Sequence, residues 1–239
     1  MKNYFFITGT GKGIGKALAE ILLKDKQNYV YGLSRTNVLT HSNFSFVKID
    51  LSKNEDLENY TFPVLEKAQR ITLINNAGLI GDIKPMGKKK TASIIDTIMV
   101  NTTATAVLIN SFIATFQNQK AEKLILNISS GAGRHPIHSW ADYCASKSAM
   151  DMLSLVVQEE QQYKENPIKI FSVAPGIIDT NMQNEIRTAH KNDFPLKQQF
   201  VDMKNTQALA SPQETAFLLL KIINNKADYQ DIILDVREI

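Results

Sequence analysis

The sequence contains very little cysteine, since Cys144 is the only one among 239 residues. No internal disulfide can form, and the two pairs of thiolate ligands that many zinc sites use are missing. This usage is consistent with a reducing compartment, and we expect a cytoplasmic protein. The histidines share no spacing that would indicate a metal site, so we expect no bound metal. They are His41, His135, His138 and His190.

Long apolar runs are also lacking. The first run, residues 4–7, is too short for a signal peptide and ends at once in Thr8-Gly9, which indicates a buried strand. The best candidate for a membrane span, residues 105–116, is interrupted by Asn110 and Ser111 and falls short of about eighteen apolar residues. We therefore expect neither an exported chain nor a membrane protein.

Charge of one sign is not in excess either. Lysine and arginine number 27 against 24 aspartate and glutamate residues, which leaves a net charge of only +3. The basic residues are dispersed except for Lys88-Lys89-Lys90. Such a run is typical of a solvated loop or of the start of a helix, with nucleic-acid binding as the alternative. We expect no nucleic-acid partner.

With 44% hydrophobic and 21% charged residues, the chain can bury one sizeable core, and we expect a single domain over residues 1–239. Short apolar runs rich in β-branched and aromatic residues alternate with segments of helical period. This alternation predicts an α/β fold of the Rossmann type, a doubly wound parallel sheet of seven strands with helices on both faces. The predicted strands are residues 4–8, 29–34, 44–49, 71–75, 123–129, 168–174 and 231–236.

Two of the helical segments have apolar residues at a spacing that would place them against the sheet. These residues are Ile14, Leu18, Ile21 and Leu22 in the first segment, and Ala149, Met152, Leu153 and Val156 in the second.

Residues 179–211 form an exception, because they are polar and show no strong period. We interpret this stretch as a helix-poor substrate lid, with an irregular surface excursion as the alternative.

A glycine-rich turn, Thr8-Gly9-Thr10-Gly11-Lys12-Gly13-Ile14-Gly15, joins the first predicted strand to the first helix. Glycines let the backbone approach a pyrophosphate, and the helix N-terminus favours its negative charge. The literal G-x-G-x-x-G pattern is absent, and a turn that binds nothing is the alternative.

The pentapeptide Tyr143-Cys144-Ala145-Ser146-Lys147 places Tyr143 and Lys147 at i and i+4 on one helix face. A nearby ammonium lowers the pKa of a phenol and makes proton exchange with a carbonyl or alcohol oxygen feasible. A half-buried tyrosine over a snorkelling lysine is the alternative. Ser130 lies thirteen positions before Tyr143, at the carboxyl end of a predicted strand, where open α/β sheets bind ligands.

These motifs together resemble the short-chain dehydrogenase/reductase family, over essentially the whole chain. The spacing Gly9-x-x-x-Gly13-x-Gly15 is the family's glycine motif, and Asp50-Leu51 resembles its adenine-side contact. Asn75-Asn76-Ala77-Gly78 resembles its sheet-stabilising motif. The turn Pro175-Gly176-Ile177-Ile178-Asp179-Thr180 resembles the one beside its nicotinamide.

The resemblance implies four catalytic residues. Tyr143 would exchange the proton and Ser130 would bind the substrate oxygen. Lys147 would hold the nicotinamide ribose and lower the pKa of Tyr143, and Asn101 would hold a water in a proton relay from Lys147. The residues it implies for the cofactor are Gly9, Thr10, Lys12, Gly13, Ile14, Gly15, Ser34, Arg35, Asp50, Leu51, Asn76, Ala77, Gly78, Tyr143, Lys147, Pro175, Gly176, Ile178 and Thr180.

The end of the second predicted strand indicates which nicotinamide cofactor is used. An acidic residue there would bind a free ribose hydroxyl and repel a 2′-phosphate, but the strand ends in Leu33-Ser34-Arg35. Arg35 offers a planar cation suited to phosphate, and in similar NADP-preferring proteins a residue placed like Lys12 reaches the same group. Two solvated basic residues are the alternative. We expect NADP(H).

The resemblance thus implies an NADPH-dependent reductase of a small-molecule carbonyl substrate. The second half is similar to bacterial benzil reductases and to sepiapterin reductase, which suggests a diketone substrate. Trp140, Ile178, Met182 and residues 135–138 would form an apolar pocket for it, with ordinary packing as the alternative. Other readings are a pterin, sugar or other carbonyl substrate, or an NADP-binding sensor without catalysis. Apolar helix faces around residues 101–116 and 145–157 lead us to expect a homodimer or homotetramer.

Overall fold

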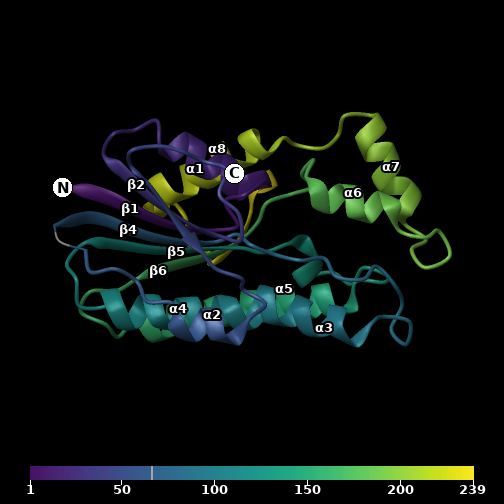
Figure 1. The fold of residues 1–239 in the computed structure, drawn as a ribbon, viewed down its shortest axis with the longest axis horizontal. Helices are drawn as coiled ribbons and strands as arrows, with labels where there is room; N and C mark the ends of the chain where they lie inside the picture. The colour runs from purple at the N-terminus through teal and green to yellow at the C-terminus, as the bar shows by residue number, and fades with distance from the viewer. Residues whose placement is uncertain (66) are drawn as a thin grey trace.

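The computed structural model describes residues 1–65 and 67–239, and a parallel seven-stranded sheet runs through its middle (Figure 1). The strand order is β3-β2-β1-β4-β5-β6-β7. The chain begins at the central strand β1, adds β2 and β3 toward one edge, and then returns to β4 and adds β5, β6 and β7 toward the other edge. This confirms the predicted fold class, and each predicted strand is present to within a few residues. The strands are β1 (Lys2–Thr8), β2 (Asn28–Ser34), β3 (Phe44–Lys48), β4 (Ala68–Asn75), β5 (Glu122–Ile128), β6 (Lys169–Ala174) and β7 (Ile233–Asp235).

Helices cover both faces of the sheet (Figure 1). One face is covered by α1 (Gly13–Leu22) and α8 (Pro212–Asn224), and the other by α2 (Asn54–Asn59), α4 (Ala104–Phe116) and α5 (Ala141–Gln161). A π-helical turn, Met99–Thr103, joins α3 (Thr91–Ile98) to α4 without a break. Short 3-10 turns occur at Gly131–Gly133, Lys226–Asp228 and Val236–Glu238.

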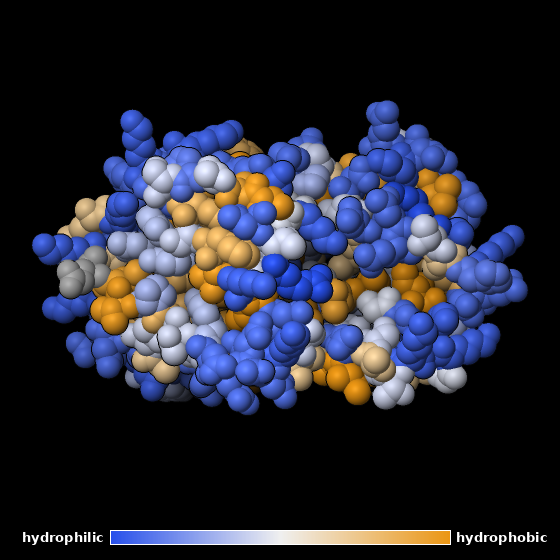
Figure 2. Space-filling view, viewed as in Figure 1, coloured by the Kyte–Doolittle hydropathy of each residue, from blue (hydrophilic) through white to orange (hydrophobic). Residues whose placement is uncertain are grey.

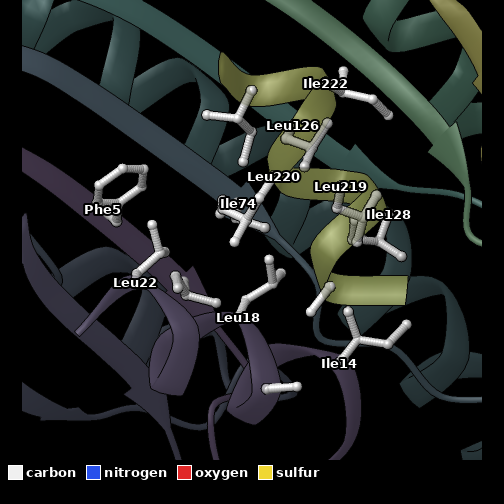
Figure 3. Packing of buried hydrophobic residues seen from close by; sticks show 14 of the residues in the cluster. Phe5, Ile14, Leu18, Leu22, Ile74, Leu126, Ile128, Leu219, Leu220 and Ile222 are labelled. Atoms are coloured by element: carbon white, nitrogen blue, oxygen red, sulfur yellow. The ribbon is translucent and has the colours of Figure 1, made fainter. Parts of the chain in front are cut away.

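The core between the sheet and the first pair of helices is built as the sequence predicts. Ile14, Leu18 and Leu22 of α1 point toward the strands and toward α8 (Figure 3). Leu18 is fully buried, whereas Ile21 is only partly buried at the edge of this cluster. Burying each such side chain stabilises the fold by roughly 1.5–3 kcal/mol.

The predicted inner face of α5 is wrong in part, since Leu153 packs against the core but two of its neighbours do not. Met152 and Val156, which we expected against the sheet, have exposed fractions of 60% and 48%. The buried side of the helix instead carries Met150 and Val157 together with serines that bind buried asparagines. Nδ2 of Asn127 donates to Oγ of Ser154 over 2.9 Å. The apolar stripe of α5 therefore faces outward.

The continuous helical stretch Thr91–Phe116 is 26 residues long and contains an 18-residue window with a mean hydropathy of 1.5. By length and composition alone it qualifies as a membrane span, although the sequence predicted none. Leu108, Phe112 and Phe116 are buried in the cluster that packs under the sheet. Of the apolar window 39% is buried, so packing in the core accounts for part of its apolar residues.

The expected lack of regular structure over residues 179–211 is also wrong. Two helices form there, α6 (Asn181–Thr188) and α7 (Lys197–Asn205). Ile186, Phe194 and Phe200 anchor them by packing with Trp140. The two helices lie beyond the carboxyl ends of the strands, and their outer surface is mostly hydrophilic (Figures 1 and 2). Because only a few apolar residues anchor this segment, its helical period is hard to detect in the sequence.

Candidate active site

A cavity of about 1160 Å³ opens at the carboxyl ends of the central strands. Its volume exceeds the usual range of about 300–1,000 Å³ for ligand sites, which suits a large ligand together with a smaller one. Most of the residues predicted for cofactor and catalysis line it. They are Gly9, Lys12, Gly13, Ile14, Ser34, Arg35, Asp50, Leu51, Asn76, Ala77, Gly78, Ser130, Tyr143, Lys147, Pro175, Gly176, Ile178 and Thr180.

Three predicted residues do not line the cavity: Thr10, Gly15 and Asn101. The Thr10 hydroxyl shares a hydrogen bond of 3.3 Å with Ser34, which braces the turn from behind. A Cβ at Gly15 would lie 2.6 Å from the backbone oxygen of Gly9, so this glycine allows α1 to pack closely. Thr10 and Gly15 thus shape the glycine turn, while the adjacent residues Gly9, Gly11 and Ile14 line the cavity.

The glycine turn adopts a backbone conformation that other residues rarely take. Gly9 has φ +77° and Gly13 has φ +58°. Within the described residues, no side chain caps the N-terminus of α1, and its first turn contains no acidic residue. The free amides of this turn face the cavity and are ready to bind an anionic group such as a pyrophosphate.

The turn is held to the sheet through Thr8 at the end of β1. Its Oγ1 accepts hydrogen bonds of 2.9 Å from the backbone N–H groups of Asn76 and Ala77. Nδ2 of Asn76 in turn donates to the Thr8 carbonyl over 2.8 Å. These bonds fix the ends of β1 and β4 next to one another, which places the glycine turn and residues 76–78 along one wall.

At the far end of this wall lie Arg35 and Asp50. Partial burial opposes ionisation of Asp50, but hydrogen bonds from Ser52 and the positive charges of Arg35 and Lys53 hold the pKa of its carboxyl below the usual value. Lys12 and Arg35 are exposed at the surface of the cavity. This end of the cavity is therefore polar, with two cations that a phosphate can reach.

Ser130, Tyr143 and Lys147 meet at the other end. Nζ of Lys147 donates to the carbonyl of Ile128 over 2.8 Å and lies 5.8 Å from the centre of the Tyr143 ring. Ser130 begins the turn after β5, where its Oγ accepts a 3.2 Å hydrogen bond from the Ala132 N–H. The structure thus brings together the three residues that the sequence singled out for chemistry.

Burial dominates the ionisation of this group. It raises the pKa of Tyr143 to about 12, although a hydrogen bond with Ser130 opposes the shift. Burial also lowers the pKa of Lys147 to about 8, against the opposing charge of Asp151. Burial therefore outweighs the other influences on the Tyr143 phenol, and the predicted lowering of its pKa by Lys147 stays a prediction. Tyr143 is a neutral phenol, which is the form that can donate a proton to a carbonyl oxygen.

Asn101 lies next to this group in the π-helical turn, a form often found near functional sites. Its side chain is already occupied: Oδ1 accepts from the Leu79 N–H and Nδ2 donates to the Leu79 carbonyl, both over 2.8 Å. Nδ2 also donates to Ser146 over 2.9 Å. The side chain therefore holds the loop after β4 against α5, and its predicted water-relay role stays a prediction.

The interpretation of Lys88-Lys89-Lys90 as solvated is wrong for Lys89. Its side chain is 1% exposed, and its Nζ lies 2.7 Å from Oδ1 of Asp142, whose side chain is 3% exposed. It also donates to the Asp82 carbonyl. This buried ion pair joins the loop before α3 to the first turn of α5, directly before Tyr143. Nothing in the lysine run itself distinguishes the one that points inward.

The sequence also missed most of the apolar wall beside Tyr143. The Trp140 ring lies 5.7 Å from Phe194 in a stacked arrangement and 5.7 Å from Tyr143 edge to face. Phe200 packs with both Trp140 and Phe194. Trp140, Ile178 and Met182 line the cavity, as expected of a substrate pocket. The sequence signal that could have predicted this wall is the presence of Phe194 and Phe200 within the otherwise polar residues 179–211.

Comparisons with known proteins identify the family of this chain. The family model for short chain dehydrogenases matches residues 3–191. Benzil reductase ((S)-benzoin forming) of Bacillus cereus is 32% identical, over 99% of this chain and 100% of the relative. The benzil reductase of Bacillus subtilis (strain 168) is 34% identical, over 98% of each chain. Sepiapterin reductase of Xenopus laevis is 28% identical, over 92% of this chain and 90% of the relative.

Solved structures share the fold and differ in the cofactor they contain. A 4-hydroxyisoleucine dehydrogenase complexed with NADH has a TM-score of 0.79 at 25% identity, covering 98% of this chain and 96% of the other. A serine dehydrogenase complexed with NADP+ has a TM-score of 0.79 at 17% identity, covering 97% and 93%. The shared fold therefore does not decide between the two cofactors.

We expect the variant Lys89→Met to lower the free energy of unfolding by about 3–5 kcal/mol, because it leaves the buried Asp142 carboxylate unpaired. Urea unfolding measures the loss. The matched control is Lys88→Met, since Lys88 is 64% exposed in its pair with Asp193 and should contribute less than about 1 kcal/mol. Lys89→Met combined with Asp142→Asn should regain most of the loss. Equal stabilities of Lys89→Met and Lys88→Met would contradict the buried pair.

Proposed function

Because this chain belongs to the short-chain dehydrogenases, a family of oxidoreductases, we propose that it is an NADPH-dependent carbonyl reductase that converts a ketone or diketone to an alcohol. The observation that carries this proposal is the convergence of Ser130, Tyr143 and Lys147 in one cavity. The uncapped start of α1 lies in the same cavity, so that a dinucleotide and a substrate fit side by side.

The protein's part in the reaction is to hold the substrate oxygen and to deliver a proton. A reduced nicotinamide, when bound, supplies the hydride to the carbonyl carbon. The neutral Tyr143 phenol gives its proton to the oxygen, and the Ser130 hydroxyl stabilises the negative charge that develops there. Lys147 holds a positive charge beneath the phenol, which favours the phenolate left after proton transfer.

The preference for NADPH is supported by the charges at the polar end of the cavity. β2 ends in Ser34 and is followed by Arg35, so no carboxylate at this strand end repels a 2′-phosphate. Arg35 and Lys12 line the cavity from two different turns, and both side chains are exposed to an incoming ligand. A guanidinium binds phosphate through two parallel hydrogen bonds to two of its oxygens. An adenosine ribose without the 2′-phosphate has no such pair of acceptor oxygens at this position.

The proposed substrate is an aromatic or vicinal diketone. Trp140 and Phe200 line the cavity, with Phe194 packed against both, and this wall suits an aromatic ring, since such rings pack well edge to face and in offset stacks. The full-length similarity to two benzil reductases supports the same substrate class.

We also propose that the protein is a homodimer or homotetramer. Met152, Leu155 and Val156 of α5 are 60%, 41% and 48% exposed and form an apolar stripe along one helix. Contiguous apolar surface of this kind is typical of an interface between subunits.

The reaction is tested with benzil and reduced nicotinamide, following the loss of absorbance of the cofactor. We expect much faster oxidation of NADPH than of NADH. Tyr143→Phe should lower kcat by roughly 100- to 10,000-fold, because the proton donor is gone. Tyr163→Phe is the control, since Tyr163 lies at the end of α5 and is 81% exposed. A preference for NADH would contradict the roles of Lys12 and Arg35, and full activity of Tyr143→Phe would contradict the mechanism.

The pH dependence should report Lys147. Its pKa is lowered to about 8, so the charged form is present below that value and is lost as pH rises through it. With Tyr143 protonated up to about 12, we expect kcat/KM for reduction to be constant below about pH 8 and to fall above it. Initial rates at saturating NADPH measure the profile, with circular dichroism to show that the fold persists. A rate that stays constant to pH 10 would exclude a requirement for the ammonium.

A further inference from the structure

An ion pair between Asp179 and Lys204 lies at the wall of the cavity. Asp179 belongs to the turn after β6 and Lys204 to the last turn of α7, and both residues line the cavity. Their side chains are 38% and 47% exposed, so an incoming ligand can reach them. An exposed pair of this kind stabilises a fold by less than about 1 kcal/mol. Stability therefore gives little reason for the pair, and its place in the cavity points to a ligand.

The pair lies beside the glycine turn. The residue after Asp179 is Thr180, and a Cβ at Gly13 would lie 3.5 Å from its Cγ2. Gly13 is the first residue of α1, whose start has no side-chain cap among the residues that the structure describes. The free amides at this helix start favour a pyrophosphate. The Asp179 carboxylate and the Lys204 ammonium are therefore close to the place where we expect the pyrophosphate of the cofactor.

Backbone contacts hold α7 near this turn. Ile178 and Ala210 form a parallel bridge, which joins the two ends of the segment that contains α6 and α7. The Asp179 N–H donates to the Ala210 carbonyl over 2.9 Å, and the Ala210 N–H donates to the Ile177 carbonyl over 3.1 Å. Lys204 precedes Ala210 by only six positions. Its ammonium is thus brought to the cofactor side of the cavity by a segment whose ends are tied together.

The other cations of the cavity have partners or proposed roles of their own. Within the described part of the chain, the lysines and arginines that line the cavity are Lys12, Arg35, Lys147, Lys204 and Arg237. The first two are proposed for the 2′-phosphate, and the third lies at Tyr143. Arg237 is held by the Asp235 carboxylate through hydrogen bonds of 2.9 Å and 2.6 Å from Nε and Nη2. Lys204 is the lining cation that lies beside the glycine turn.

The charge of Asp179 makes this lysine necessary for binding. A carboxylate beside bound phosphate groups repels them, and a cation between the two relieves the repulsion. An ammonium has three N–H donors, so it can bind Asp179 and a phosphate oxygen at the same time. We infer that Lys204 is a cofactor ligand, which α7 supplies to the pyrophosphate. This inference rests on the proposed function only for the use of a nicotinamide dinucleotide, since NADPH and NADH contain the same pyrophosphate.

The affinity for each reduced cofactor, measured by its fluorescence, tests the contact. Lys204→Met keeps most of the side-chain length but removes the charge, and we expect Kd to rise roughly tenfold for NADPH and for NADH alike. Lys191→Met is the matched control. Lys191 is an exposed lysine between α6 and α7 that does not line the cavity, so its loss should change neither affinity. Arg35→Met, by contrast, should weaken the binding of NADPH alone.

A double variant separates direct contact from neutralisation of Asp179. Asp179→Asn removes the repulsion, so this variant should bind both cofactors at least as tightly as wild type. If Lys204 touches the pyrophosphate, adding Lys204→Met to Asp179→Asn should still raise Kd several-fold. If Lys204 only neutralises Asp179, the double variant regains the wild-type affinity, and the inference is overturned. Circular dichroism of each variant shows whether the fold persists.

The remaining outcomes are equally decisive. An unchanged Kd in Lys204→Met would overturn the contact while the proposed reductase stands. A loss confined to NADPH would place Lys204 at the 2′-phosphate, which contradicts the assignment to the pyrophosphate. If the wild-type protein binds neither cofactor, the proposed function is wrong and the inference is overturned with it.

Discussion

The arrangement of the active site depends on the position of Lys147 under the end of β5. Its Nζ is bound to the Ile128 carbonyl over 2.8 Å, so that a buried ammonium ties α5 to the last residue of the strand. In the residue just before it, the Ser146 hydroxyl accepts a hydrogen bond from Asn101, and two turns farther along Ser154 accepts one from Asn127 of β5. These contacts set the rotation of α5 about its axis. With that rotation fixed, Tyr143 projects into the cavity and the apolar stripe of the helix is left on the outside.

The same burial that orders the site also selects its protonation state. A phenol with its pKa raised to about 12 remains a proton donor, and an ammonium with its pKa lowered to about 8 carries its charge below that pH and loses it above. The loop after β4 completes the enclosure. It is attached to α5 through the Asn101 side chain on one side of Tyr143 and through the Lys89–Asp142 pair on the other.

The sequence predicts the features that are set by local chemistry. The strands are predicted by short apolar runs that alternate with helical segments. The turn after β1 is predicted by its glycines, two of which adopt positive φ angles, and the Tyr143–Lys147 pair is predicted by helical spacing. It does not predict the features that depend on distant partners. The inner face of α5 is chosen by Asn101 and Asn127, which periodicity cannot detect. Lys89 is buried because it pairs with Asp142, which lies 53 positions later in the chain. The helices α6 and α7 are stabilised by the packing of Ile186, Phe194 and Phe200 with Trp140.

The central claim is that one cavity holds NADPH and a ketone, with the nicotinamide at Tyr143 and the 2′-phosphate at the Arg35 end. A crystal structure of the protein with NADP+ and benzil tests it most directly. The account predicts the phosphate against Arg35 and Lys12, the nicotinamide ribose against Lys147, and one benzil oxygen between Ser130 and Tyr143. A nicotinamide placed away from Tyr143, or a 2′-phosphate that points into solvent with no contact to Arg35 or Lys12, would contradict it.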